Sequence, residues 1–229
     1  MSTACISQFR KRLYSKWLPG FCHAPHRNLS TSGFKEQSLD NLSEHDALWF
    51  LRAIELDLVT EADGFFTAPL SRAKEQIFWT GSRNVDPRPL TLWIEPVITI
   101  GALAKLNLSH KWPAEKLGTQ SQTWAFDLVG YGDTENHEFL ACEVKKTTRE
   151  IDLLIELMKQ YGADGSIQEP EKAKEKNAYR KSEGIRRTWP SVFWALGPNN
   201  YSKVFDVIKR NEREFELVEM GSDRLTRST

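Results

Sequence analysis

The chain has 229 residues, of which 40% are hydrophobic and 27% are charged, and its formal net charge is zero. These values are typical of a folded globular protein, and the neutral charge argues against a protein that coats nucleic acid without specificity. No apolar run approaches the roughly 18 residues of a membrane span. Three scattered cysteines, Cys5, Cys22 and Cys142, are too few for a disulfide framework and predict a reduced, cytoplasmic protein.

The charge is unevenly distributed along the chain. Residues 1–35 contain six Lys and Arg and no Asp or Glu, so this segment is basic and the remainder is acidic. We predict that residues 1–40 form a partly ordered basic arm with an anionic partner. A mitochondrial transit peptide is the alternative, because such peptides are basic and poor in acids. Pro19, Gly20 and Pro25 oppose a long helix in this arm.

Residues 41–89 are predicted to form a helical N-terminal extension. Within it, residues 43–56 have an apolar helical stripe, and Ser43 is suited to cap the helix start. Residues 71–79 are predicted to be a second, short helix. Residues 80–89 are predicted to be a loop, because two X-Pro pairs in this segment block helix formation.

Residues 90–229 are predicted to form an α/β core with a mixed sheet flanked by helices. The segment between residues 163 and 187 is polar and charged, and is predicted to be a connection. The remaining elements expected in this core, in chain order, are a helix at 93–106, a hairpin within 126–146, a helix at 148–162, a strand at 191–197, a helix at 202–211 and a strand at 214–220.

The hairpin carries charged residues inside otherwise apolar strands. Side chains alternate between the two faces of a strand, so Glu143 and Lys145 share one face. With the turn at residues 133–136, Asp127 lies opposite Ala141 or Glu143, and either register puts Asp127 and Glu143 side by side on that face. Two adjacent carboxylates are destabilising unless something compensates. Mg²⁺ is commonly held by one or two carboxylates together with phosphate oxygens. The pattern therefore predicts a Mg²⁺ or Mn²⁺ site on Asp127 and Glu143, where Lys145 stabilises developing charge.

The pattern formed by Asp127, Glu143 and Lys145 resembles the motif of the PD-(D/E)XK nuclease superfamily. The resemblance covers roughly residues 90–200, and Phe126 stands where the family motif has proline. It implies a restriction-endonuclease-like mixed sheet flanked by helices, with the helical N-terminal extension added to it. In that family the aspartate and the glutamate-x-lysine pair lie on adjacent strands and bind the catalytic metal.

The resemblance implies a metal-dependent nuclease that hydrolyses phosphodiester bonds of nucleic acid, with DNA favoured as the substrate. Family members often add an acidic ligand from the preceding helix, for which Glu95 is the candidate. The alternative for Glu95 is a carboxylate that simply favours a helix N-terminus. The alternative function is a catalytically inactive module of this fold that binds nucleic acid or protein. A homodimer is expected if the substrate is double-stranded, because one active site serves one strand.

A phosphate-contacting surface is predicted beside this site. Residues 172–187 contain seven Lys and Arg against two Glu, a local net charge of +5. The alternative is a solvated helix whose charges form pairs with one another. The candidate nucleic-acid-binding residues are Lys172, Lys174, Lys176, Arg180, Lys181, Arg186 and Arg187.

Overall fold

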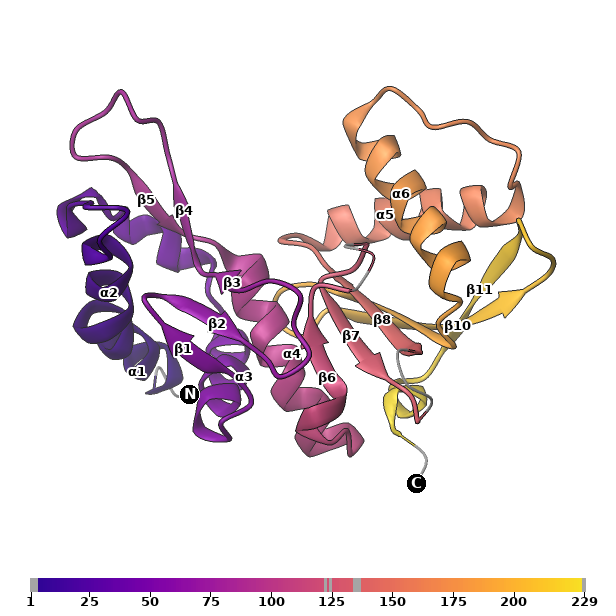
Figure 1. Cartoon of the computed structure of the whole chain (residues 1–229), viewed down its shortest axis with the longest axis horizontal. Helices are drawn as coiled ribbons and strands as arrows, with labels where there is room; N and C mark the ends of the chain where they lie inside the picture. The colour runs from indigo at the N-terminus through magenta and orange to yellow at the C-terminus, as the bar shows by residue number, and fades with distance from the viewer. Residues whose placement is uncertain (1–3, 122, 124, 134–136, 228–229) are drawn as a thin grey trace.

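A six-stranded mixed sheet forms the centre of the C-terminal part of the chain (Figure 1). The structure is a computed structural model that describes residues 4–121, 123, 125–133 and 137–227. The sheet has the order β11-β10-β9-β8-β7-β6, in which β8 and β9 are parallel and the other neighbours are antiparallel. Its strands are β6 (Leu117–Thr119), β7 (Leu128–Tyr131), β8 (Glu138–Val144), β9 (Val192–Leu196), β10 (Ser202–Lys209) and β11 (Phe215–Met220).

Helices cover both faces of this sheet, which confirms the predicted mixed α/β architecture. On one face lies α4 (Ile94–His110), and on the other lie α5 (Thr148–Ala163) and α6 (Ala173–Thr188). Strand β8 is buried on both sides, since Leu140 and Cys142 pack with α4 and Ala141 packs with α5 and α6. Alternation along β8 therefore points Glu143 toward α5 and α6.

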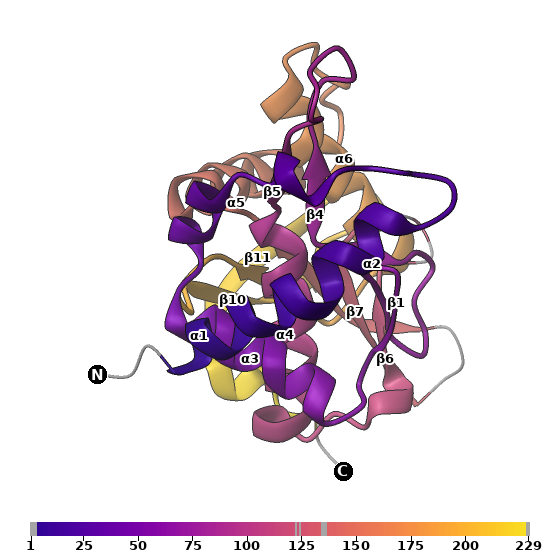
Figure 2. The ribbon, with the colours of Figure 1, turned by 90° about the vertical axis from the view of Figure 1, so that its left-hand side faces the viewer.

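The N-terminal part packs its own helices and small sheets against α4 (Figure 2). α3 and α4 approach closely, because a Cβ at Gly101 would lie 3.1 Å from the Phe50 nitrogen. The elements here are α1 (Ala4–Arg12), a π-helix (Leu13–Trp17), α2 (Leu18–His23), α3 (Glu44–Glu55), β1 (Thr60–Ala62), β2 (Phe65–Thr67), β3 (Glu75–Gln76), β4 (Phe78–Thr80) and β5 (Leu90–Leu92). Short 3₁₀ helices span Thr31–Gly33, Glu36–Asn41, Ala114–Lys116 and Ser222–Leu225.

The first residues do not form the partly ordered arm that was expected. Phe9, Leu13 and Trp17 recur every four residues and are all buried, so residues 4–23 pack as a helical layer on the core. Three basic side chains of this layer pair with carboxylates of the same chain. These ion pairs are Arg10–Glu36, Arg12–Glu55 and Lys16–Glu61.

Two predicted helices are strands in the structure. Residues 71–79 contain β3 and β4, and β4 pairs with β5. Residues 202–211 contain β10, which pairs with β9 and β11. In β10, Val204 and Phe205 are buried on opposite faces of the sheet, and a short apolar run of this kind is compatible with a helix or a strand. Pairing with neighbouring strands of the same sheet decided the outcome.

The other predicted elements are confirmed, with one exception. The predicted connection at residues 163–187 is helical from residue 173 onward, where it forms α6. α3 begins after Ser43, whose hydroxyl accepts a hydrogen bond from the Asp46 N–H at 3.0 Å. α4, α5, β9 and β11 lie where the sequence pattern placed them. Across the described residues, no helix is both long enough and apolar enough to cross a membrane.

Candidate active site

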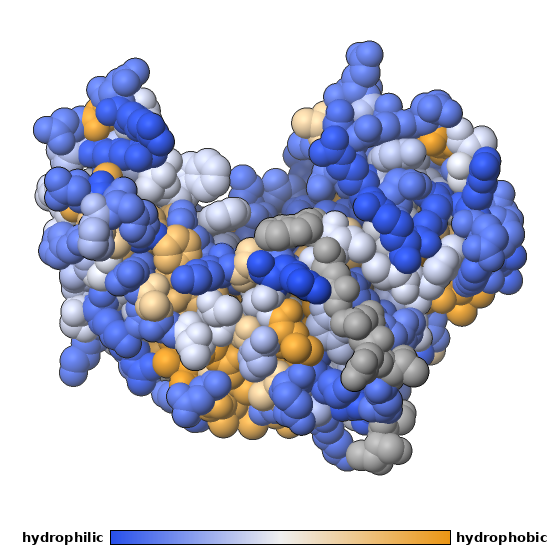
Figure 3. All heavy atoms as spheres, viewed as in Figure 1, coloured by the Kyte–Doolittle hydropathy of each residue, from blue (hydrophilic) through white to orange (hydrophobic). Residues whose placement is uncertain are grey.

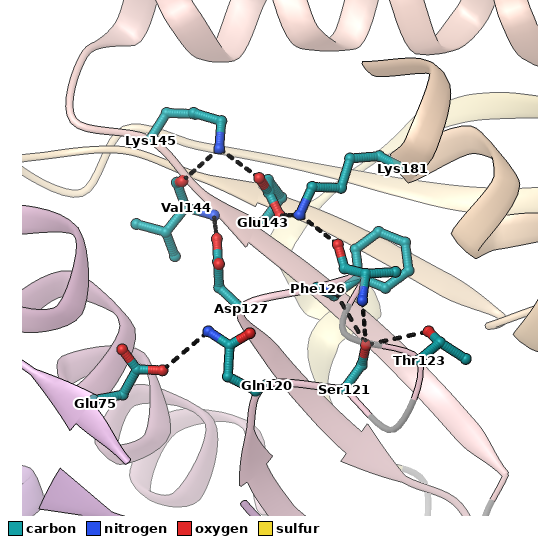
Figure 4. Close-up of polar contacts among 11 residues, drawn as sticks. Glu75, Gln120, Ser121, Thr123, Phe126, Asp127, Glu143, Val144, Lys145 and Lys181 are labelled. Atoms are coloured by element: carbon teal, nitrogen blue, oxygen red, sulfur yellow. Dashed lines mark hydrogen bonds and ion pairs between the residues drawn. The ribbon is translucent and has the colours of Figure 1, made fainter. Parts of the chain in front are cut away.

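The pairing of β7 and β8 brings Asp127 and Glu143 together (Figure 4). Leu128 is paired with Cys142, so continuing the antiparallel register by one residue places Asp127 opposite Glu143. The Asp127 N–H donates to the Cys142 carbonyl at 3.0 Å, and the Asp127 Oδ2 accepts from the Val144 N–H at 2.8 Å. This placement agrees with the register expected from the hairpin. Residues 134–136 of the turn lie outside the described residues.

Two lysines from different elements hold the Glu143 carboxylate. Glu143 is only 1% exposed. Its Oε1 accepts a hydrogen bond from the Lys145 ammonium, and its Oε2 lies 2.5 Å from the Lys181 Nζ. Lys181 comes from α6 and also donates to the Ala125 carbonyl. A charge buried to this degree is costly unless it is paired, so the two lysines make the buried Glu143 tolerable.

Lys181 reaches Glu143 because α6 lies unusually close to the segment before β7. A Cβ at Gly184 would lie 2.6 Å from the Ala125 Cβ and 3.1 Å from the Phe126 ring. Only glycine permits this approach, and Gly184 lies one helical turn beyond Lys181. Ser121 fixes the same segment, since its hydroxyl accepts from the N–H groups of Ala125 and Phe126 at 2.9 and 3.1 Å.

The three ionisable side chains of the site, Asp127, Glu143 and Lys145, differ in their protonation at neutral pH. Burial, together with repulsion from Glu143, raises the pKa of Asp127 to about 7. Burial alone would also raise the pKa of Glu143, but attraction to Lys181 and Lys145 outweighs it and lowers that pKa. Burial opposes charge on Lys145, yet the neighbouring Glu143 outweighs it and raises the Lys145 pKa. At neutral pH, Glu143 is therefore an anion and Lys145 a cation. Asp127 is divided between its protonated and its ionised form.

Glu95 lies near the end of β8, at the first turn of α4. Its Oε1 accepts from the Lys146 N–H and its Oε2 from the Trp93 indole N–H, both at 3.1 Å. In the part of the chain that the structure describes, no three His, Cys, Asp or Glu side chains are grouped closely enough to hold a metal ion. The pairing of β7 and β8 places the carboxylates of Asp127 and Glu143 at neighbouring positions, and carboxylate oxygens are hard donors of the kind that Mg²⁺ and Mn²⁺ prefer.

A cavity of about 210 Å³ opens beside Lys145, between α5 and α6. Leu153, Leu154 and Leu157 form its apolar wall, and Lys174 and Asn177 contribute polar groups. The surface view shows a hollow between the lobe that carries β4 and β5 and the lobe that carries α5 and α6 (Figure 3).

The basic residues of 172–187 do not form one continuous surface for phosphate. Lys181 is turned into the site, and Arg186 is packed inward, where it donates to the Tyr161 and Arg213 carbonyls and pairs with Glu183. Lys174 and Arg187 are exposed. Lys172, Lys176 and Arg180 form surface ion pairs with Glu175 or Glu169. Such pairs contribute little stability, so these three cations can exchange partners.

Buried Glu75 and half-buried Gln120 form a hydrogen-bonded pair next to Asp127 that the sequence did not reveal. The Gln120 side chain donates to the Glu75 Oε1 at 3.2 Å, and the Gln120 N–H donates to the Asp127 carbonyl at 2.9 Å. Glu75 is 7% exposed. Burial raises its pKa to about 7, although the Gln120 amide opposes the shift. No local pattern marks Glu75, because its partner is reached only through tertiary folding.

Glu75→Gln is expected to raise the free energy of unfolding by about 1–3 kcal/mol near pH 8 and to change it little near pH 4. The pKa of Glu75 is about 7 in the folded chain against its ordinary value of 4.5. Between these values the folded chain binds more protons, so stability falls as pH rises, and the full penalty applies above about pH 7. Glutamine keeps the hydrogen bond without the charge.

Urea unfolding at both pH values measures this difference, with Glu171→Gln on the exposed surface as the matched control. A gain of equal size at both pH values would contradict the assignment, because the titration of Glu75 would then play no part.

The site therefore combines two carboxylates from paired strands, a cationic lysine held by one of them and an adjacent cavity. Such an arrangement can bind a divalent cation and place an ammonium beside an anionic substrate. Comparison of the chain with protein-family models, with curated proteins and with solved structures finds no match.

Proposed function

We propose that the chain is a metal-dependent nuclease of the PD-(D/E)XK type that hydrolyses phosphodiester bonds of nucleic acid, with DNA as the favoured substrate. The observation that carries the proposal is the meeting of Asp127, Glu143 and Lys145 where β7 and β8 lie side by side. The family resemblance implies this arrangement, with the three residues on adjacent strands of a mixed sheet flanked by helices.

Asp127 and Glu143 would hold the Mg²⁺ or Mn²⁺ ion. The raised pKa of Asp127 supports this assignment, because it reports burial and repulsion between two carboxylates that a divalent cation would relieve. When bound, the ion would act as a Lewis acid on a phosphoryl oxygen and lower the pKa of a water ligand.

The remaining roles follow from the contacts of each side chain. Lys145 would place its positive charge against the phosphate and stabilise the negative charge that develops there. The Val144 N–H holds the Asp127 carboxylate, and Lys181 holds the second oxygen of Glu143. Lys181 is therefore a positioning residue, since it acts through Glu143.

One observation favours a second candidate function, a nucleic-acid or protein-binding module without catalysis. Both oxygens of Glu143 lie against lysine ammonium groups, so its charge is already compensated by the protein itself. A binding module needs no metal, and this pairing would suffice to stabilise its fold.

The test is cleavage of end-labelled DNA and RNA, single-stranded and duplex, with Mg²⁺ or Mn²⁺ and with a chelator. We expect cleavage that requires the metal and that falls by roughly 100- to 1,000-fold in Glu143→Gln. Calorimetry should show Mn²⁺ binding that is lost in both Glu143→Gln and Asp127→Asn. Glu171→Gln, on the exposed surface, is the control.

Thermal unfolding of each variant establishes that it is folded. Binding of nucleic acid without cleavage, unchanged by Glu143→Gln, would favour the binding module. Mn²⁺ binding that neither substitution reduces would exclude Asp127 and Glu143 as the ligands.

A further inference from the structure

Trp79 is the most exposed large hydrophobic side chain among the described residues, with 57% of its surface open to solvent. Side chains alternate along β4, so Trp79 points outward while the preceding residue, Phe78, is fully buried. Trp79 touches Trp93 edge to face, with ring centroids 5.3 Å apart and planes at 81°. An edge-to-face contact uses little of the area of an indole, so much of the Trp79 ring remains available to a ligand.

This tryptophan pair is linked to the candidate active site by two hydrogen bonds. The Trp93 indole N–H donates to one oxygen of Glu95, and the Lys146 N–H donates to the other, each at 3.1 Å. Lys146 directly follows Lys145. Trp79 lies on β4, whose lobe faces the lobe of α5 and α6 across the hollow of the surface view (Figures 1 and 3).

Cations occur on the segments that adjoin the pair. Lys146 and Arg149 are exposed at the end of β8 and the start of α5. On the side of β4, the Arg88 guanidinium donates to the Gly81 carbonyl at 2.9 Å and to the Thr80 hydroxyl at 3.0 Å, next to Trp79 in the chain. An exposed indole ring together with cations on adjoining segments suits a ligand that alternates flat rings with negative charges.

We propose that Trp79, supported by Trp93, stacks on an unpaired base, and that the preferred substrate is single-stranded nucleic acid. The inference rests on the proposed nuclease function. In a duplex the faces of each base are covered by its neighbours, whereas a single strand exposes them. Stacking is tolerant of sequence, because every base has a π face. Lys146 and Arg149 contact the phosphates of the same strand.

The test is fluorescence anisotropy with labelled single-stranded DNA, single-stranded RNA and duplex DNA of one sequence, in a chelator that prevents cleavage. Trp79→Ala is expected to weaken single-strand binding by roughly 5- to 100-fold and to change duplex binding less than about twofold. Trp79→Phe should retain most of the affinity, because it keeps a ring. Leu108→Ala removes another exposed apolar side chain, 53% open and on α4, and should have no effect.

The outcomes separate this inference from the proposed function. Single-strand affinity that Trp79→Ala leaves unchanged would overturn the stacking role, while metal-dependent cleavage would still support the nuclease. Equal losses for duplex and single strand would also overturn the role. A native chain that neither binds nor cleaves any of these nucleic acids would overturn both. The relative affinities for single-stranded DNA and single-stranded RNA identify which nucleic acid the Trp79 surface prefers.

Discussion

Lys145→Met is expected to lower metal-dependent cleavage by roughly 100- to 1,000-fold while the chain stays folded. Methionine is close to lysine in length but carries no charge, so the substitution removes the cation that the proposed function places beside the substrate phosphate. The Glu143 carboxylate raises the pKa of Lys145, so its charge persists at every working pH. Loss of the fold is not expected, because Lys181 still pairs with Glu143 at 2.5 Å.

Initial cleavage rates and thermal unfolding, measured on the same preparations, check this result. Lys174→Met is the matched control, since Lys174 lines the cavity beside Lys145 but is exposed and contacts neither carboxylate in the described structure. Equal losses in both variants would mean that general positive charge, and not the position of Lys145, supports cleavage. Full activity of Lys145→Met would remove the lysine from the proposed mechanism.

Trp17→Ala is expected to lower the free energy of unfolding by about 3–5 kcal/mol. Trp17 is 2% exposed and packs edge to face on Phe9, Phe50 and Phe66, with ring centroids 5.1, 5.3 and 5.9 Å away. Its removal leaves a cavity at the centre of this aromatic cluster, which joins the N-terminal helices to α3 and β2. A loss of this size is a large part of the total stability of a typical domain.

Urea unfolding followed by circular dichroism measures the change. Tyr14→Ala, on the same helical segment but 42% exposed, is the control and should cost far less. If Trp17→Ala were as stable as the native chain, residues 4–23 would not contribute to the core, and the expected basic arm would be the better description.

The core of the site could be predicted from the sequence because its geometry is local. Alternation along a strand and a short turn are enough to place Asp127 beside Glu143, and the same alternation places Lys145 near them. Capping by Ser43 and the apolar stripe of residues 148–162 are local signals as well, and both helices form where they were expected. The two helix signals depend on residues only a few positions apart, and the hairpin depends on two strands joined by one short turn.

Contacts between distant segments could be decided only by the tertiary structure. Lys181 was expected to face phosphate, but the close approach of α6 at Gly184 turns it onto Glu143. The pairing of Glu75 with Gln120 likewise joins segments far apart in the chain, and β10 forms because it pairs with the strands on either side of it, β9 and β11. Local patterns indicate which side chains share a face of one element. Which elements pack together is decided by the free energy of burying apolar surface, and this free energy depends on the whole chain.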